Sequence, residues 1–306
     1  MRRPDVVIDD DLVVRLLAAQ HPDLVALPLT AVASGWDHVT YRLGDDLALR
    51  LPRRELGAGM IQGEQRLLPA LAPQLPVEVP VPVRVGVPTD DYPYHWSVTR
   101  WVDGQALDDG VLDAADAARV VEVLQALQAV ADPPIGSAPH NPYRGIPLVE
   151  RRDGLHTRLD LLAAGSAPDD AELDPARLRA RFEAAAAVAR STSPRWIHGD
   201  LHPRNVVVRD GRLAGVVDWS DVTAADVATD LAFFWFGFDD PAARQFARGA
   251  WSADEWERGI GWAIVLGATM ATARGEPLMR RIGAACLRRV LAEACLLYTS
   301  PSPRDS

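Results

Sequence analysis

Hydrophobic and polar positions in the first hundred residues repeat with two different periods. Apolar residues at three- and four-residue spacing are typical of amphipathic helices, and short β-prone runs between turn signals such as Ser34–Gly35 and Gly44–Asp45 are typical of antiparallel strands. The elements expected are a helix at 9–20, three short strands within 28–52, a helix at about 58–71, a proline-rich connector or edge strand within 76–88, and a strand ending at Gly104.

After Gly104 the pattern becomes helical. Helices are expected at 113–130 and at 174–190, where Asp174–Pro175 supplies an N-cap with proline at the first helical position, and the apolar run 261–273 is expected to be a buried helix. The chain therefore predicts an α+β fold with two parts, followed by a terminal segment that is expected to be disordered or foreign to the natural protein. The predicted boundaries are 1–103 for the sheet-rich lobe, 104–296 for the helical lobe and 297–306 for the terminal segment.

Two valine-rich runs flank Asp210–Gly211, a strong signal for a two-residue hairpin turn. If this turn fixes the register, Arg209 faces Arg212, Val207 faces Ala214 and Asn205 faces Val216. Asn205 and Asp218 then share one face at the same end of the hairpin, as diagonal neighbours about 7 to 8 Å apart. Their oxygens could hold one Mg²⁺, whose ligands lie at roughly 2.0 to 2.1 Å.

The stretch "HGDLHPRN" at 198–205 leads into the first strand of this hairpin. Asp200 lies five positions before Asn205, which is the H-x-D-x-x-x-x-N spacing of a kinase catalytic loop followed by a metal-holding aspartate. Phosphoryl transfer needs positioning and charge neutralisation more than a strong base, so an aspartate can accept the proton of a substrate hydroxyl.

With "GVVDW" at 215–219, this stretch resembles the aminoglycoside phosphotransferase family of kinase-like small-molecule enzymes, whose hallmark is H-G-D in place of H-R-D. Weaker likeness extends over nearly the whole chain, through "ASGWDHVTYRL", "LALRLP", "GEQRLLPAL", "TRWVDG" and "DVATDLA". The resemblance implies a two-lobed protein-kinase-like fold with a small antiparallel-sheet N-lobe and a larger helical C-lobe.

The resemblance also implies roles for individual residues. Asp200 would orient the acceptor hydroxyl and accept its proton, while Asn205 and Asp218 would hold Mg²⁺ on the phosphates of ATP or GTP. The residues implied in nucleotide binding are Arg50, on the α and β phosphates and braced by Glu64; the backbone of Arg100 and Val102, on the base; and Ser34 and Gly35, covering the phosphates.

Three features depart from the kinase pattern. Arg50 stands where many kinases use lysine, which leaves two interpretations: a degraded kinase that only binds nucleotide, or a chain that contains no lysine and uses arginine's planar fork instead. The intact Asp200, Asn205 and Asp218 favour the second. The loop "SGWDH" has a single glycine, and Ala224–Ala225 precede Asp226 where the family usually has glycine.

Other motifs have a structural and a functional interpretation. His198 and His202 could suggest zinc, but the segment has no cysteine and no third histidine, so we expect His198 to anchor the loop by hydrogen bonds. The aromatic run 233–238 could line a substrate pocket, although buried core is the favoured interpretation. Asp221, three residues after Asp218, is a weak candidate for binding a cationic acceptor.

Composition narrows the class of protein. The net charge of −10 disfavours nonspecific binding to nucleic acid and suits a cationic acceptor, although solubility alone explains many acidic chains. Cys286 and Cys295 are too far apart along one expected helix for a disulfide, which favours a reducing, cytoplasmic location. No run is long enough for a membrane span, and a monomer or weak dimer is expected.

The sequence thus predicts transfer of the γ-phosphate of a nucleoside triphosphate to a hydroxyl of a small molecule. An aminoglycoside or a related antibiotic such as a macrolide is the favoured acceptor. One alternative keeps the mechanism and changes the acceptor to a metabolite such as a sugar, choline or an amino alcohol. A second alternative, from a different class, is a catalytically silent nucleotide-binding protein.

Overall fold

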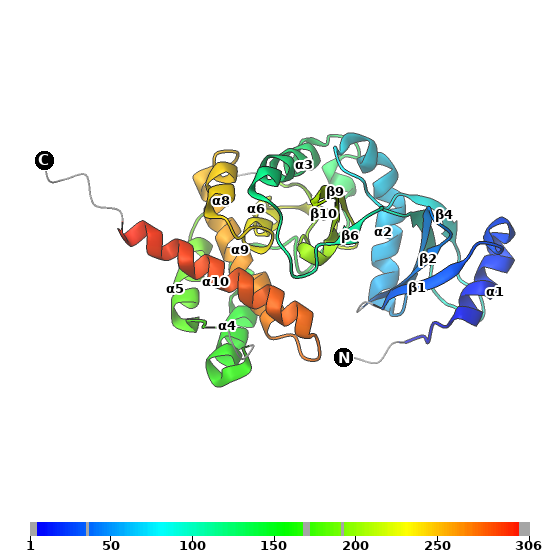
Figure 1. Cartoon of the computed structure of the whole chain (residues 1–306), viewed down its shortest axis with the longest axis horizontal. Coiled ribbons are helices and arrows are strands. Elements are labelled where there is room, and N and C mark those ends of the chain that lie inside the picture. Colours follow the sequence, from blue (N-terminus) through cyan, green and yellow to red (C-terminus); the bar gives the residue numbers. More distant parts are fainter. Residues whose placement is uncertain (1–4, 35–36, 168–171, 191–192, 300–306) are drawn as a thin grey trace, which may run out of the picture.

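The sheet-rich and helical parts of the chain lie side by side in the computed structural model, which describes residues 5–34, 37–167, 172–190 and 193–299 (Figure 1). The N-terminal part is built on a five-stranded antiparallel sheet in the order β1-β2-β3-β5-β4. Its strands are β1 (Leu29–Ser34), β2 (His38–Leu43), β3 (Leu47–Pro52), β4 (Pro82–Gly86) and β5 (Trp96–Arg100).

These strands agree with the sequence-based prediction in all but one boundary. The three strands expected within 28–52 are present. The proline-rich segment supplies the edge strand β4, and proline is tolerated there because the outer side of an edge strand has no neighbour to which an N–H must donate. The expected strand end at Gly104 is wrong, because β5 ends at Arg100. There the N–H of Trp101 turns to the carbonyl of Asp46.

Two helices cover different sides of this sheet. α1 (Asp10–Gln20) is capped by Asp9, whose carboxylate accepts the N–H of Leu12, and it packs into a small core with β2, β3 and β5. α2 (Glu55–Leu71) begins three residues before the expected start and lies between the sheet and the helical lobe (Figure 1). Its last turns, with Leu67 and Leu71, belong to the core of the helical lobe, so α2 ties the two lobes together.

The helical lobe contains the predicted helices and several short ones. Asp174 caps α5 through the N–H of Arg177, as the sequence indicates. The helices are α3 (Ala117–Ala129), α4 (Arg152–Leu161), α5 (Pro175–Ala186), α6 (Ala228–Leu231), α7 (Phe233–Phe236), α8 (Pro241–Arg248), α9 (Ala253–Ala271) and α10 (Pro277–Thr299). α10 continues to Thr299, three residues into the terminal segment 297–306 that the sequence set apart from the helical lobe.

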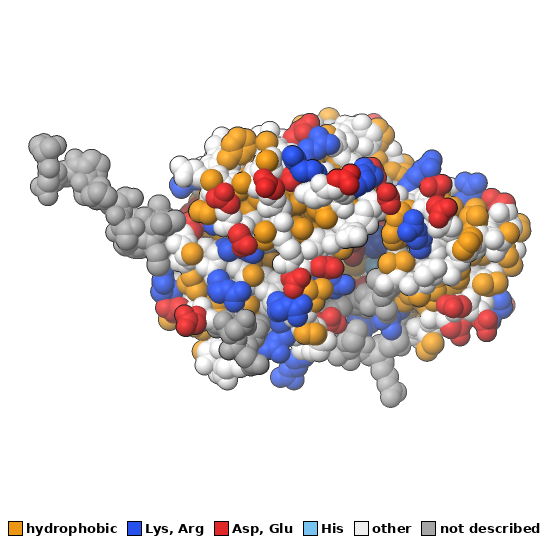
Figure 2. Space-filling view, in the orientation of Figure 1, with side chains coloured by type: hydrophobic (Ala, Val, Ile, Leu, Met, Phe, Trp, Pro, Cys, Tyr) orange, Lys and Arg blue, Asp and Glu red, His pale blue; other side chains and the backbone are white. Residues whose placement is uncertain are grey.

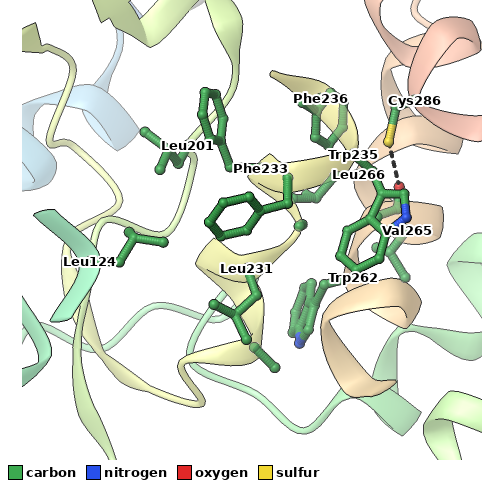
Figure 3. Close-up of a cluster of buried hydrophobic side chains, with 14 of the residues drawn as sticks. Leu124, Leu201, Leu231, Phe233, Trp235, Phe236, Trp262, Val265, Leu266 and Cys286 are labelled. Atoms are coloured by element: carbon green, nitrogen blue, oxygen red, sulfur yellow. Dashed lines mark hydrogen bonds between the residues drawn. The ribbon is translucent and has the colours of Figure 1, made fainter. Parts of the chain in front are cut away.

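The aromatic run 233–238 is core and does not line an open pocket. Phe233, Trp235 and Phe236 are at most 1% exposed and pack with Trp262 of α9 (Figure 3). Leu201, the residue after Asp200, belongs to the same cluster and is drawn beside it in Figure 3. The core therefore holds one side of the loop that carries Asp200.

The surface carries charges of both signs. On the face drawn in Figure 2, basic and acidic side chains are interspersed among scattered apolar ones, so the net charge of −10 is not gathered in a single patch on that face. Every helix in the described part of the chain is too short or too polar to span a bilayer.

Candidate active site

The loop that carries Asp200 and Asn205 runs between two short strands. β7 (Arg195–Ile197) pairs with β10 (Thr223–Ala225) on one side, and β8 (Val206–Arg209) forms the hairpin with β9 (Arg212–Val216) on the other. A short strand, β6 (Gln105–Ala106), completes the hairpin sheet. The strands on both sides hold the ends of the loop in place.

The hairpin turn is correct and the expected register is partly wrong. Asp210 and Gly211 both have positive φ, as a type I′ turn requires, and Arg209 faces Arg212. A bulge then leaves Ala214 unpaired, so Val207 faces Gly215 and Val206, not Asn205, faces Val216.

Asn205 and Asp218 nevertheless reach the same end of the hairpin. The carbonyl of Asn205 accepts the N–H of Val217 at 2.9 Å, which sets Asn205 opposite the residue before Asp218. The side-chain nitrogen of Asn205 donates to the Asp200 carbonyl at 2.9 Å, so its oxygen is the end of the amide left for a cation. Amide and carboxylate oxygens are the donors that Mg²⁺ prefers, and this pair fits that ion.

Gly199 is required by the close approach of Asp221. It has φ +88, and a Cβ there would lie 2.5 Å from the carbonyl oxygen of Asp221. The buried carboxylate of Asp230 accepts the N–H groups of His198 and Gly199 at 2.7 and 2.9 Å. The H-G-D sequence therefore fixes a tight backbone path that presents Asp200.

His198 anchors this loop by hydrogen bonds, as the sequence indicates. Its Nε2 donates to the carbonyl of Val217 at 3.1 Å, and its ring meets Trp219 edge-on. His202 takes another position, with Nε2 3.5 Å from Oδ2 of Asp200. One histidine therefore ties the loop to the hairpin, and the other faces the candidate base.

Arg50 joins the sheet lobe to the hairpin. Its Nη1 contacts both oxygens of Glu64 at 2.5 and 2.6 Å, and its Nη2 donates to Oδ1 of Asp218 at 2.8 Å. Ser220 donates to Oδ1 of Asp218 at 2.7 Å. Burial opposes the charge on Asp218, but Arg50 and His38 outweigh it and hold the pKa of that carboxyl well below its usual range. Asp218 is thus kept ionised, which is the state in which a carboxylate can hold a cation.

Asp200 has a separate cation partner, Arg144, which the sequence did not indicate. Nη2 of Arg144 donates to Oδ1 of Asp200 at 2.6 Å. Burial would raise the pKa of Asp200, but the charges of Arg144 and His202 hold it well below the usual value. Arg144 lies in a turn 56 residues before Asp200, and neither spacing nor periodicity connects the two.

Asp221 is close to this contact. Its Oδ1 accepts the side-chain N–H of Asn141 at 2.7 Å, and burial raises its pKa although Arg144 opposes the shift. The sequence singled out Asp221 only by its distance from Asp218 and missed Asn141. The structure places Asp221 close enough to Asp200 for the two charges to interact.

The other residues predicted to bind nucleotide are Ser34, Gly35, Arg100 and Val102, and they lie in different surroundings. Ser34 ends β1 opposite Val39, and Gly35 lies outside the described residues. The N–H of Arg100 already donates to the carbonyl of Val81, so this group is engaged within the sheet. Val102 is buried against the hairpin, where a Cβ on Gly215 would meet its side chain at 2.2 Å. The connection between the lobes thus packs directly on the strand that leads to Asp218.

Comparison with known proteins decides the family. The model of the phosphotransferase enzyme family matches residues 28–265, which include the five-stranded sheet, the loop with Asp200 and the hairpin. The chain belongs to this family. It is therefore a phosphotransferase, and the kinase-like α+β fold expected from the sequence is confirmed.

Individual relatives extend the comparison. Viomycin phosphotransferase from Streptomyces vinaceus is 29% identical over 228 residues, covering 69% of this chain and 74% of that protein. The structure of wild-type aminoglycoside 2′-phosphotransferase-IIIa with GDP matches with a TM-score of 0.70 at 20% identity, covering 94% of this chain and 100% of that one. The macrolide 2′-phosphotransferase MphH from Brachybacterium faecium matches with a TM-score of 0.57 at 23% identity, covering 96% and 99%.

Proposed function

We propose that this phosphotransferase moves the γ-phosphate of ATP or GTP to a hydroxyl of a small cationic antibiotic. The observation that carries the proposal is the gathering of Asp200, Asn205 and Asp218 at one end of a hairpin, with Arg50 reaching Asp218 from the other lobe. This arrangement provides a proton acceptor, two cation ligands and a fixed cation for phosphate, which are the parts that phosphoryl transfer needs.

The chain's own residues then divide the work. Asp200 orients the acceptor hydroxyl and takes its proton, while Arg50 and the backbone near Ser34 and Gly35 bind the phosphates. Asn205 and Asp218 would hold Mg²⁺, which when bound neutralises charge on the phosphate oxygens. Glu64 keeps Arg50 in place, because its carboxylate binds Nη1 of the guanidinium while Asp218 binds Nη2.

The acceptor class follows from charge and from the relatives. Asp200 and Asp221 lie close enough for their charges to interact, and two carboxylates favour a cationic acceptor. Relatives named for viomycin, aminoglycosides and macrolides support an antibiotic. We place the reaction in the cytoplasm, because the free, buried thiol of Cys286 suits a reducing compartment.

A catalytically silent nucleotide-binding protein is the second candidate, suggested by arginine in place of lysine at position 50. The hydrogen bonds of Arg50 argue against it. Arg50 binds a glutamate on α2 and the aspartate after β9 simultaneously, so the substitution keeps the charge at the phosphate side and adds a second donor arm.

An acceptor panel tests the proposal. Purified protein is incubated with MgATP or MgGTP and, separately, viomycin, kanamycin, a macrolide, choline and glucose, and products are identified by mass spectrometry. We expect one added phosphoryl group on an antibiotic, and none with Asp200→Asn. Transfer only to choline or glucose would make the chain a metabolic kinase, and Mg-dependent nucleotide binding without any transfer would make it a silent binding protein.

A further inference from the structure

The turn that carries Arg144 is tied to the active-site loop at several points. Thr223 donates its hydroxyl to the carbonyl of Pro139 at 2.6 Å. Asn141 donates to Oδ1 of Asp221 at 2.7 Å and to its carbonyl at 3.2 Å, and its own Oδ1 accepts the N–H groups of Tyr143 and Arg144 at 2.9 Å each. The backbone of Arg144 is therefore held by the same amide that binds Asp221.

The guanidinium of Arg144 has few other partners. Its side chain is 14% exposed, and its Nε is buried with no hydrogen-bond partner among the described residues. Among the described residues, its side chain donates one hydrogen bond, from Nη2 to Oδ1 of Asp200. A buried guanidinium N–H without an acceptor costs free energy, so the contact of Arg144 is less stable than that of Arg50.

The contact engages one of the two oxygens of Asp200 that an acceptor hydroxyl can approach. A base accepts a proton only from a donor within hydrogen-bond reach, and Arg144 occupies Oδ1 of Asp200 while His202 lies 3.5 Å from Oδ2. A hydroxyl that approaches Oδ1 must share that oxygen with the guanidinium, whose charge makes Asp200 a weaker proton acceptor while the contact lasts. A water molecule competes with the guanidinium in the same way. If Asp200 activated that water, the nucleotide would be hydrolysed without transfer of phosphate to an acceptor.

We propose that Arg144 determines acceptor specificity by withholding Asp200 from water until an acceptor is bound. The inference rests on the proposed function. A cationic acceptor that binds Asp221 takes the place of the Asn141 N–H, which releases the turn at 141–145 and moves Arg144 off Asp200. Asp221 thus senses the acceptor, and Asn141 and Arg144 transmit its presence to the base.

The reaction that Arg144 prevents is hydrolysis of the donor. In it, the oxygen of water forms a bond to the γ-phosphorus, and the bond from that phosphorus to the bridging oxygen breaks. Asp200 takes one proton from the water, and the products are the nucleoside diphosphate and inorganic phosphate. No other reactant is needed.

Arg144→Gln tests the proposal through the ratio of hydrolysis to transfer. Release of inorganic phosphate from MgATP or MgGTP without acceptor should rise about ten- to a hundredfold, the range for losing one charge-assisted hydrogen bond. The KM for the acceptor should stay equal or fall, because the acceptor no longer competes with a guanidinium for Asp200. Arg144→Lys keeps a cation near Asp200 and should keep hydrolysis low.

Arg181→Gln is the matched control. Arg181 pairs with Glu257 away from the site, and the side-chain exposures of 19% and 31% are close to the 14% and 25% of Arg144 and Asp200. Hydrolysis and transfer in this variant should equal those of the wild type. A rise in hydrolysis as large as that of Arg144→Gln would overturn the proposal, because general loosening of the lobe would explain both.

A second variant covers the case in which Arg144→Gln fails to fold. Asn141→Ala removes the tie to Asp221 and leaves Arg144 in the chain, and it should also raise acceptor-free hydrolysis. If wild-type protein transfers phosphate but these variants hydrolyse no faster, or if Arg144→Gln raises the acceptor KM, the inference alone is wrong. If wild-type protein transfers phosphate to no acceptor, the proposed function fails with it.

Discussion

Two arginines hold the two aspartates of the site in different ways. Arg50, on β3, contacts Glu64 and Asp218 with separate nitrogens and receives further support from Ser220. Arg144, in a turn, contacts Asp200 through one nitrogen and leaves its Nε without a partner among the described residues. The first contact joins two lobes, and the second joins two loops of one lobe.

The difference indicates which contact is fixed and which can change. An ion pair with its hydrogen bonds satisfied resists disruption, because removing either member leaves a buried charge behind. A single contact on a turn can be exchanged for a ligand at lower cost. We therefore regard the Arg50 contact as the frame on which nucleotide binds and the Arg144 contact as one that acceptor binding replaces.

The largest expected effects come from removing each aspartate's charge. Asp200→Asn should lower kcat by roughly two to four orders of magnitude and change nucleotide affinity little, because Asp200 faces the acceptor. Asp218→Asn should lower kcat and also weaken Mg-dependent nucleotide binding, because Asp218 is the charged member of the proposed pair of cation ligands. Steady-state kinetics and calorimetric titration of nucleotide measure the two effects.

The exposed Asp239 provides the control for both variants. Its side chain is 69% exposed, and its partner Arg289 also donates to the carbonyls of Trp235 and Phe236, so Asp239→Asn should leave kcat and nucleotide affinity unchanged. Equal loss of nucleotide binding in Asp200→Asn and Asp218→Asn would show that the two aspartates share one role, and the division between the two arginine contacts would be wrong.

Loss of Glu64 should affect stability next most strongly. Glu64 is 1% exposed, and Glu64→Ala leaves Arg50 buried with part of its pairing gone, which should lower the free energy of unfolding by about 3 to 5 kcal/mol. Glu122→Ala is the control, because Glu122 forms an exposed pair with Arg119 worth about 0 to 1 kcal/mol. Chemical denaturation measures both, and a similar small loss in each would contradict a buried frame.

The pairing of Arg50 with Glu64 could be predicted from the sequence, whereas the contact of Arg50 with Asp218, 168 residues away, was not indicated. Strand β3, helix α2 and the hairpin each follow periodicity or turn chemistry, and the resemblance to kinases then pairs Arg50 with Glu64. The bulge at Ala214 could not be predicted, because the turn residues do not encode an extra unpaired residue. The register was therefore wrong by one, although Asn205 and Asp218 still lie at one end of the hairpin.

The contact of Arg144 with Asp200 could not be predicted because it depends on tertiary packing alone. The turn around Asn141 and Arg144 has no hydrophobic period, and it reaches Asp221 and Asp200 only after the lobe has folded. The predicted end of strand β5 was wrong for a similar reason. β5 ends at Arg100, where the next N–H finds Asp46, a partner more than fifty residues earlier in the chain.

A pH experiment addresses the surroundings of the Arg50 contact and has the smallest expected effect. His38 lies beside it, buried, with Nε2 donating to the carbonyl of Gly57. Burial and the charge of Arg50 lower the pKa of His38 from its ordinary 6.5 to about 4. Between pH 6.5 and 4, His38 therefore binds a proton in the unfolded chain but not in the native protein. The free energy of unfolding falls as the pH drops through this range.

His38→Gln keeps a hydrogen-bond donor for Gly57 and removes the titrating group. Between pH 7 and 4 the wild type should lose about 3 kcal/mol more free energy of unfolding than this variant, since each unit of pKa shift corresponds to about 1.4 kcal/mol. His140→Gln changes an exposed histidine and should follow the wild-type curve. Parallel curves for His38→Gln and wild type would mean that His38 is protonated beside Arg50.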